Sequence, residues 1–363
     1  MIQLTVEQLR EYLCKVFGPT ARLTGVGEIG SLEEQGMKDF GYGKPALLTF
    51  EVDGQERQAV LSMMKGDKYG HQNWWDRAGI LMFQYDASPR MERHVLPLSL
   101  GYVSEDGSLH PVHRPREFFI LNEKLQGHDY FLDLERIRKG GMRERDIELA
   151  RRFARWLSRV HSKKLDDPDR YYRRVRNHLG ASESIMGLID EAYPHPYESF
   201  SEERFMALEK RLIDWRWKLK RYAHRLSAVH GDFHPWNVLV RDEGGKPDFS
   251  VLDRSRGEWG EPADDLATMA INYMLFGLYR EPRLSGDFST LYLAFFEEYL
   301  EQSKDREILE VMGPFFVMRG LVLASPEWYP SHPASIREGL FRFIENVLED
   351  EAFLYADVNR YME

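Results

Sequence analysis

Three oxygen-bearing side chains stand close together in one short stretch of the sequence. Asp232 is followed five positions later by Asn237, and Asp253 lies a short way downstream. The apolar runs 238–240 and 249–252 flank a loop rich in turn-forming residues, which predicts a β-hairpin. The three polar side chains could therefore meet at one end of that hairpin.

The pairing register of the hairpin decides whether these side chains share a face. Symmetric pairing about Gly245 would place Asn237 opposite Asp253, with Cβ atoms roughly 4.5–5.5 Å apart. An amide oxygen and a carboxylate at that spacing suit Mg²⁺, which also keeps waters and phosphate oxygens as ligands. Asp232, at the entry to the hairpin, could accept a hydroxyl proton beside the metal. The register is assumed, because a slip of one residue would put the two side chains on opposite faces.

The overall composition is that of an ordinary globular protein. Of 363 residues, 43% are hydrophobic and 30% are charged, and the net charge is −10, which argues against disorder and against a general nucleic-acid binder. Cys14 is the only cysteine, so a disulfide within the chain is impossible, which fits a reducing cytosol. The first ten residues do not read as a signal peptide, and no stretch approaches the length of about 18 apolar residues that spans a membrane. We expect a cytoplasmic protein without membrane contact.

Positive charge is concentrated in residues 136–176. This segment holds 15 Lys and Arg against 6 Asp and Glu, an excess of nine. Two explanations are open, which are solvated helix faces and a surface that binds an anionic partner.

The kind of element that the sequence predicts changes near residue 122. Before it, short strands dominate, at 45–52, 58–64, 96–103 and 117–125, with helices at 5–16 and 74–87. After it, helices dominate, at 145–161, 205–226, 261–273, 288–302, 308–323 and 335–348. The sequence therefore predicts an α+β protein with a sheet-containing part at 1–122, a linker at 123–127 and a helical part at 128–363.

Two glycine clusters precede or begin the expected strands. Residues 25–30 match the string GxGxxG, but no apolar strand precedes them and no clear helix follows, so we reject a dinucleotide-binding motif. A second cluster occupies residues 36–43. Either cluster could cover phosphates with backbone N–H groups, and both could equally be hairpin turns.

The pair His230 and His234 has a spacing that could suggest zinc. That geometry needs a helix, and Gly231 and Pro235 oppose one, so we predict no zinc site and a structural role for His230. Asp265, near the start of a later helix, is expected to cap that helix or anchor a loop.

These motifs resemble those of the aminoglycoside phosphotransferase and choline kinase-like family, relatives of the protein kinases. The family's catalytic loop reads His-Gly-Asp, four residues, then Asn, as at 230–237. Its second metal-binding Asp matches Asp253, and its string Gly-x-Pro-x-x-Asp-Leu-Ala stands at 260–267. A helix ending in Leu-x-x-Leu-His is matched more loosely at 157–161. The strong motifs cover roughly residues 225–270.

The resemblance implies a two-lobed, protein-kinase-like fold with a nucleotide, ATP or GTP, in the cleft. It implies Asp232 as catalytic base and Asn237 and Asp253 as Mg²⁺ ligands. It further implies a set of nucleotide-contacting residues in the sheet-containing part and the linker: Lys65, Asp76, Glu123, Leu125, Gly41 and Gly43. Within this set Lys65, expected at the end of a strand, would contact phosphate and pair with Asp76, with Lys68 as a rival.

One departure from the family concerns the acceptor side. Arg254 and Ser255 follow the metal Asp where the family usually has an aromatic residue and an acid, so Arg254 could contact a phosphate or an anionic substrate. Conversely, Glu258 and Glu327 could attract a cationic amine.

The resulting functional prediction is an ATP- and Mg²⁺-dependent kinase that phosphorylates a hydroxyl of a small molecule, such as an aminoglycoside, amino alcohol or sugar. The alternative is a nucleotide-binding, non-catalytic regulator that uses the basic 136–176 surface to bind a partner. The intact set of Asp232, Asn237 and Asp253 favours the kinase. The sequence leaves the acceptor and the oligomeric state open.

Overall fold

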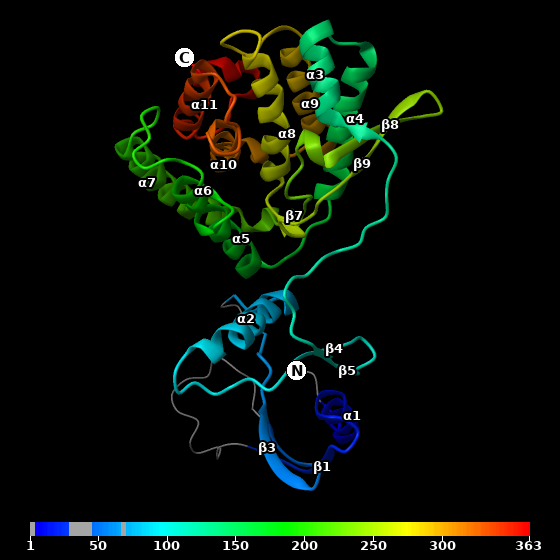
Figure 1. Ribbon diagram of the computed structural model, residues 1–363. Helices are drawn as coiled ribbons and strands as arrows, with labels where there is room; N and C mark the ends of the chain where they lie inside the picture. The colour runs from blue at the N-terminus through cyan, green and yellow to red at the C-terminus, as the bar shows by residue number, and fades with distance from the viewer. Residues whose placement is uncertain (1–3, 29–45, 67–69) are drawn as a thin grey trace. The chain divides into compact units, whose positions relative to one another are not determined.

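The computed structural model of the chain describes residues 4–28, 46–66 and 70–363 (Figure 1). It divides into two compact units, Met1–Asn122 and Glu123–Glu363. The glycine cluster at 36–43, with Gly41 and Gly43, lies outside the described residues, as does Lys68.

The first unit is built on a three-stranded antiparallel sheet. Strands β1 (Arg22–Glu28), β2 (Ala46–Val52) and β3 (Gln55–Leu61) are ordered β1-β2-β3. Asp53 and Gly54, with φ of 52° and 78°, close the β2–β3 hairpin, as the Asp-Gly pair predicts. Helix α1 (Val6–Phe17) begins at a capping box of Thr5 and Gln8 and contributes two leucines to the core of this unit.

The remaining elements of the first unit agree with the predictions in part, because β4 (Leu100–Val103) lies within the strand predicted at 96–103. Helix α2 (Trp74–Ala87) is where the sequence predicts it, but β4 and β5 (Leu109–Val112) form a short hairpin. Residues 117–125 form no strand, so that prediction is wrong. Strand propensity reflects packing against neighbouring strands, and within this segment Phe119 and Leu121 are 93% and 91% exposed.

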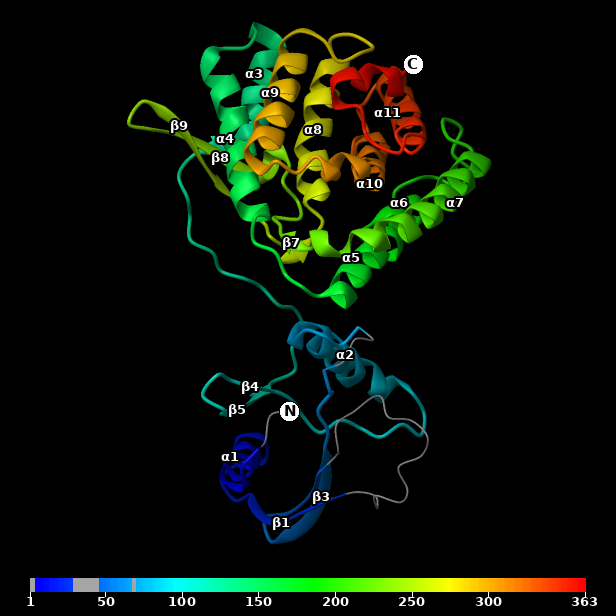
Figure 2. The same ribbon diagram turned by 180° about the vertical axis from the view of Figure 1, so that it is seen from behind.

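The second unit is a helical bundle (Figures 1 and 2). Its helices are α3 (Tyr130–Gly140), α4 (Glu144–His161), α5 (Pro168–Gly180), α6 (Ile185–Glu191), α7 (Glu202–Leu219), α8 (Pro262–Leu278), α9 (Gly286–Ser303), α10 (Gly313–Ala324) and α11 (Ala334–Asn346). Every residue of α8 is buried, so this helix forms the centre of the unit.

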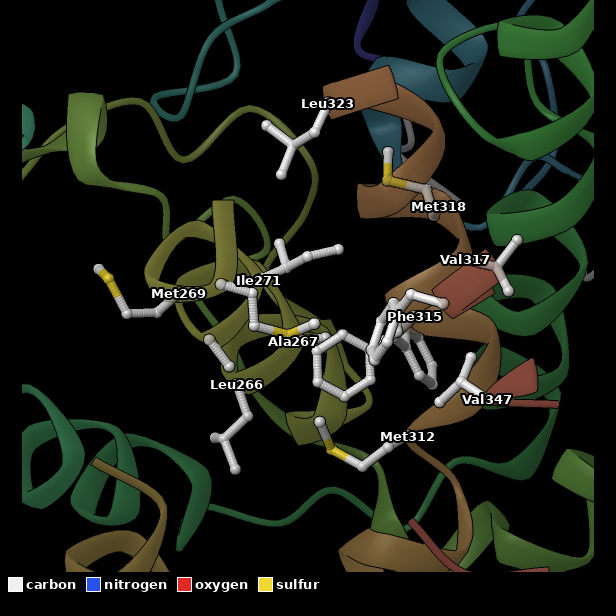
Figure 3. Packing of buried hydrophobic residues seen from close by; sticks show 14 of the residues in the cluster. Leu266, Ala267, Met269, Ile271, Met312, Phe315, Val317, Met318, Leu323 and Val347 are labelled. Carbon is white, nitrogen blue, oxygen red and sulfur yellow. The ribbon is translucent and has the colours of Figure 1, made fainter. Parts of the chain in front are cut away.

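Helix α10 packs directly on α8. Figure 3 shows apolar side chains of the two helices, among them Ile271 and Phe315, filling the space between them. Gly320 permits close packing on the other side of α10, because a Cβ there would lie 2.2 Å from Cγ2 of Ile344 in α11. The position of α10 is therefore fixed by contacts on two sides.

Two small sheets accompany the bundle. Strands β6 (His128–Asp129), β8 (Val238–Glu243) and β9 (Lys246–Val251) are antiparallel in the order β6-β8-β9. Strand β7 (Ser227–Ala228) pairs with β10 (Trp259–Gly260).

The hairpin of β8 and β9 confirms the predicted elements but corrects their register. Gly244 and Gly245 both have positive φ, 58° and 79°, so they form a two-residue turn of the I′ kind. The pairing is therefore centred between the two glycines, and Val238 faces Val251. The predicted symmetry about Gly245 alone is wrong by one residue.

Among the described residues, no helix is long and apolar enough to cross a membrane.

Candidate active site

The loop that carries Asp232 is anchored from α8. Both carboxylate oxygens of Asp265, which is fully buried, accept backbone N–H groups of this loop, from His230 at 2.8 Å and from Gly231 at 2.7 Å. Nε2 of His161, the last residue of α4, lies 3.1 Å from the same carboxylate, and its Nδ1 lies 2.9 Å from the hydroxyl of Tyr299. Asp265 therefore anchors a loop, one of the two roles that the sequence suggests.

Asp265 stays ionised although its side chain is buried. Burial by itself raises the pKa of its carboxyl, but the contacts with His161 and with the loop outweigh burial, so the pKa is lowered. The carboxylate therefore remains ionised as an acceptor for two backbone N–H groups.

The structure brings Asp232 and Asn237 together. Pro235 begins a 3₁₀ turn, η4 (Pro235–Asn237), which folds the loop back on itself. Nδ2 of Asn237 donates to the carbonyl oxygen of Asp232 at 3.1 Å, and both side chains are buried. Residues 230–234 form no helix, as Gly231 and Pro235 predict.

Asp253 reaches the same end of the hairpin by a different geometry from the one predicted. Both Asp253 and Asn237 lie outside the paired strands, so strand alternation does not govern them. The N–H of Leu252 donates to the carbonyl oxygen of Asn237 at 2.9 Å, and Asp253 follows with φ of 54° and an exposed side chain. The predicted cross-strand pairing of Asn237 with Asp253 is wrong, although their backbones are neighbours.

The donor set fits a magnesium ion. Because Nδ2 of Asn237 is engaged, its amide oxygen is the atom that could bind a metal ion, and Asp253 offers an exposed carboxylate. The described part of the chain contains no group of three or more His, Cys, Asp or Glu that could hold a metal by itself. Two hard oxygen donors leave positions for waters and phosphate oxygens, the arrangement that Mg²⁺ prefers.

The partner of Asp232 is an arginine that was not among the predicted site residues. Nη1 of Arg319, in α10, lies 2.5 Å from Oδ1 of Asp232, and its Nη2 contacts Oδ1 of Asp264 at 2.8 Å and the carbonyl of Gly231 at 2.9 Å. One sequence signal was available, because Arg319 is the only charged residue in the apolar α10. A buried arginine needs an acidic partner.

The second oxygen of Asp232 has looser contacts. Nε of Arg256 lies 3.3 Å from Oδ2, and Nε2 of His234 lies 3.8 Å from it. Burial raises the pKa of Asp232, but Arg319, Arg256 and His234 together outweigh burial, so the pKa is lowered. The carboxylate is therefore ionised at neutral pH, with Oδ1 held by the shorter contact and Oδ2 in longer contacts.

Other predicted residues lie in simpler surroundings. Lys65 is exposed and lies beyond the end of β3 at Leu61, so its predicted place at a strand end is wrong. Asp76 accepts the N–H of Asn73 at 2.8 Å and so helps to cap α2. Glu123 is exposed and Leu125 is half-buried, in a segment that forms neither helix nor strand.

The arginine that follows Asp253 has a structural role. Arg254 donates to the carbonyl of Val229 at 2.9 Å and to that of Glu258 at 3.1 Å, so it ties two loops together. It is Arg256, two residues later, that reaches Asp232.

Much of the positive charge of residues 136–176 is neutralised within the chain. Arg136 pairs with Asp133 and Asp146, and Arg155 pairs with Glu148 and Glu298. These contacts favour the first explanation, helix faces with internal ion pairs, over a surface that is free to bind an anionic partner.

The fold and the site define a class of protein. One unit contains antiparallel strands, and the larger unit is helical and carries a His-Gly-Asp loop. These are the features of a protein-kinase-like phosphotransferase, and they agree with the predicted α+β fold. The sequence model of the phosphotransferase enzyme family matches residues 96–302, and the chain belongs to this family. The membership confirms the predicted family and enzyme class.

Comparison with solved structures gives distant similarities. Plasmodium vivax ethanolamine kinase is 12% identical with a TM-score of 0.33, over 93% of this chain and 80% of that chain. Spectinomycin phosphotransferase in complex with ADP and spectinomycin is 11% identical with a TM-score of 0.31, over 99% of both chains. Glucosamine kinase in complex with glucosamine, ADP and inorganic phosphate is 14% identical with a TM-score of 0.35, over 98% and 83%. No curated protein matches the chain.

Proposed function

We propose that the protein transfers the γ-phosphate of ATP, in the presence of Mg²⁺, to a hydroxyl group of a small molecule. The observation that carries this proposal is the buried unit of Asp232 and Asn237, anchored by Asp265, in a chain of the phosphotransferase family. The assay described below, run with GTP in place of ATP, shows which of the two nucleotides is the phosphate donor.

Asp232 has the geometry of a base that orients the acceptor. Its Oδ1 is held by Arg319, so Oδ2 is the atom that accepts the acceptor's hydroxyl proton. The acceptor oxygen forms a bond to the γ-phosphorus, the bond from that phosphorus to the oxygen of the leaving ADP breaks, and the proton passes to Asp232. Positioning and neutralisation of charge supply most of the rate enhancement in such reactions.

Asn237 and Asp253 are proposed to hold the metal, and Lys65 to contact a phosphate group. When bound, Mg²⁺ would neutralise charge on the phosphate oxygens. Asp76, Glu123 and Leu125 are proposed nucleotide contacts, with the linker at 123–127 as the adenine-binding segment.

The test is ADP release from ATP and Mg²⁺ across a panel of small-molecule alcohols, comparing the natural protein with D232N. This variant keeps the shape of the side chain but removes its charge, so we expect turnover to fall at least about 100-fold. D242N is the matched control. Asp242 lies on the hairpin that follows the loop of Asp232, and its exposed carboxylate pairs with Arg145 of α4. Full turnover by a folded D232N protein would overturn the role of Asp232.

A further inference from the structure

Three arginine side chains surround the start of α8 and the loop that carries Asp232. Arg319 is fully engaged, because its guanidinium contacts Asp232, Asp264 and a carbonyl. The other two, Arg174 in α5 and Arg256 in the loop after Asp253, are not neutralised in this way. Their surroundings indicate what kind of molecule binds beside Asp232.

Arg174 is held next to the site by its own helix and by two glycines. Tyr171, one turn earlier in α5, donates to Oε2 of Glu261 at 2.9 Å and so fixes α5 to the start of α8. The guanidinium lies against the backbone of residues 257–260: a Cβ on Gly257 would be 2.9 Å from Nη1, and a Cβ on Gly260 would be 3.6 Å from Nε. Glycine at these positions makes room for the arginine.

The charge of Arg174 is not compensated locally. In the described part of the chain, no ion pair joins its guanidinium to a carboxylate, and Asp264 and Asp265 act on it only through their charge. Burial lowers the pKa of Arg174, Asp264 opposes that effect, and the neighbouring Arg173 and Arg256 add to it. A cation that is removed from water without a paired anion is costly, and an anionic ligand would relieve that cost.

Arg256 adds a second cation on the same side. Its Nη1 donates to the carbonyl of Glu183 at 2.7 Å and its Nε lies 3.3 Å from Oδ2 of Asp232. The side chain keeps 21% exposure, so it remains accessible to a ligand. Its Cβ is near Gly231, and the next residue, Gly257, touches Arg174, which makes the two arginines neighbours.

The buried acidic groups nearby are already occupied, whereas Glu183 and Glu258 are exposed. Asp264 pairs with Arg319, and Asp265 accepts two backbone N–H groups and contacts His161. Among the described residues at this point, Arg174 has no carboxylate partner and Arg256 shares Asp232 with Arg319, so three guanidinium groups stand against the two paired carboxylates of Asp232 and Asp264. This balance disfavours a cationic amine and favours an anion.

We propose that the acceptor alcohol carries an anionic group, a carboxylate or a phosphate ester, which binds to Arg174 and Arg256 while its hydroxyl lies at Oδ2 of Asp232. The planar guanidinium groups suit bidentate binding of either anion. This inference rests on the proposed function and specifies the substrate class of the same site.

The first test compares acceptors that share a scaffold and differ in charge. Glycerol, glycerate, glycerol 3-phosphate and 3-amino-1,2-propanediol form one such set, and hexose, hexuronate, hexose phosphate and hexosamine form another. We expect kcat/KM for the anionic members to exceed that of the neutral and amino members at least about tenfold. A preference for the neutral or amino members would overturn the inference and leave the proposed function intact.

The second test measures anion binding directly and does not depend on turnover. Inorganic phosphate and glycerate are titrated by calorimetry into the natural protein, R174Q, R174K and R176Q. Arg176 is an exposed arginine of the same helix and serves as the matched control. We expect R174Q to weaken binding at least about tenfold, R174K to restore part of it, and R176Q to bind like the natural protein.

The two tests separate the two proposals. Equal anion binding by R174Q and R176Q, both folded as judged by their unfolding transitions, would refute the anionic subsite. ADP release that is lost in D232N supports the phosphotransferase whatever the charge of its acceptor. Anion binding through Arg174 together with ADP release that D232N leaves unchanged would support the subsite and reject the role of Asp232.

Discussion

Nη1 of Arg319 lies 2.5 Å from Oδ1 of Asp232, and this contact joins α10 to the loop that carries the proposed base. The same guanidinium reaches Asp264 in the first turn of α8. Burial lowers the pKa of Arg319, but Asp264 and Asp232 outweigh burial and raise it, so the arginine stays charged. One cation therefore fixes the orientation of Asp232 and compensates two buried carboxylates.

Replacing Arg319 with Met should destabilise the protein strongly. The change leaves Asp232 and Asp264 without their common partner, and breaking a buried pair in this way costs about 3–5 kcal/mol. R319K should retain part of the stability, because an ammonium keeps the charge but cannot contact both carboxylates in a fork. Urea unfolding of the three proteins measures the free energies.

A double replacement provides the control for Arg319. In R319M/D264N only Asp232 is left without its partner, because the charge of Asp264 is removed. The loss of stability should therefore be smaller than the sum of the losses in R319M and D264N. Because Arg319 acts by positioning Asp232, R319K should lower kcat by up to about 100-fold with little change in KM. Strictly additive losses, or an effect on KM alone, would contradict the arrangement described.

Replacing Asp265 with Asn should loosen the loop at its anchor. An amide has one acceptor oxygen in place of two, so one of the N–H groups of His230 and Gly231 loses its partner. An unsatisfied buried donor costs about 1–3 kcal/mol. Hydrogen exchange of these two amides should accelerate in D265N relative to the D242N control, and unchanged protection would show that the loop does not depend on Asp265.

Replacing Asp253 with Asn should affect metal use but hardly affect stability. Asp253 is exposed and has a left-handed backbone, which Asn tolerates better than most residues. We expect the free energy of unfolding to change by no more than about 0.5 kcal/mol. The Mg²⁺ concentration that gives half-maximal ADP release should rise at least about tenfold, because a charged ligand is lost. An unchanged Mg²⁺ requirement would remove Asp253 from the metal site.

The parts of the site that the sequence predicted are local in the chain. Asp232 and Asn237 belong to one loop, and the turn-forming Pro235 that brings them together lies between them. Asp265 was recognisable because acids favour the first turn of a helix. Local spacing and turn chemistry were sufficient for these residues.

The parts that sequence reasoning missed depend on tertiary packing. Arg319 meets Asp232 across 87 positions of the chain, and the packing of α10 on α8 and α11 determines that contact. The predicted hairpin register is wrong for a local reason, because Gly244 and Gly245 form the turn together. Lys65 was placed at a strand end because Met63 and Met64 extend the apolar pattern, whereas the pairing of β3 ends at Leu61.

His178 should make the stability of the protein depend on pH. It lies one turn after Arg174 in α5, with Nε2 3.0 Å from the carbonyl oxygen of Pro314. Burial, helped by Arg319 and Arg174 and opposed by Asp264 and the Pro314 carbonyl, lowers the pKa of His178 to about 4. The pKa of an unfolded histidine is about 6.5.

The sign of this effect follows from proton binding. Between about pH 6.5 and pH 4 the unfolded chain binds a proton at His178 that the folded protein does not, so stability falls as the pH falls through that window. H178Q keeps an N–H donor for the Pro314 carbonyl but cannot titrate. Between pH 7.5 and pH 5 the natural protein should therefore lose about 2 kcal/mol more than H178Q. Urea unfolding at the two pH values measures this difference, and equal losses in both proteins would show that His178 titrates normally. Between pH 7.5 and pH 8.5 the histidine is neutral in both states, so there the two proteins should change in parallel.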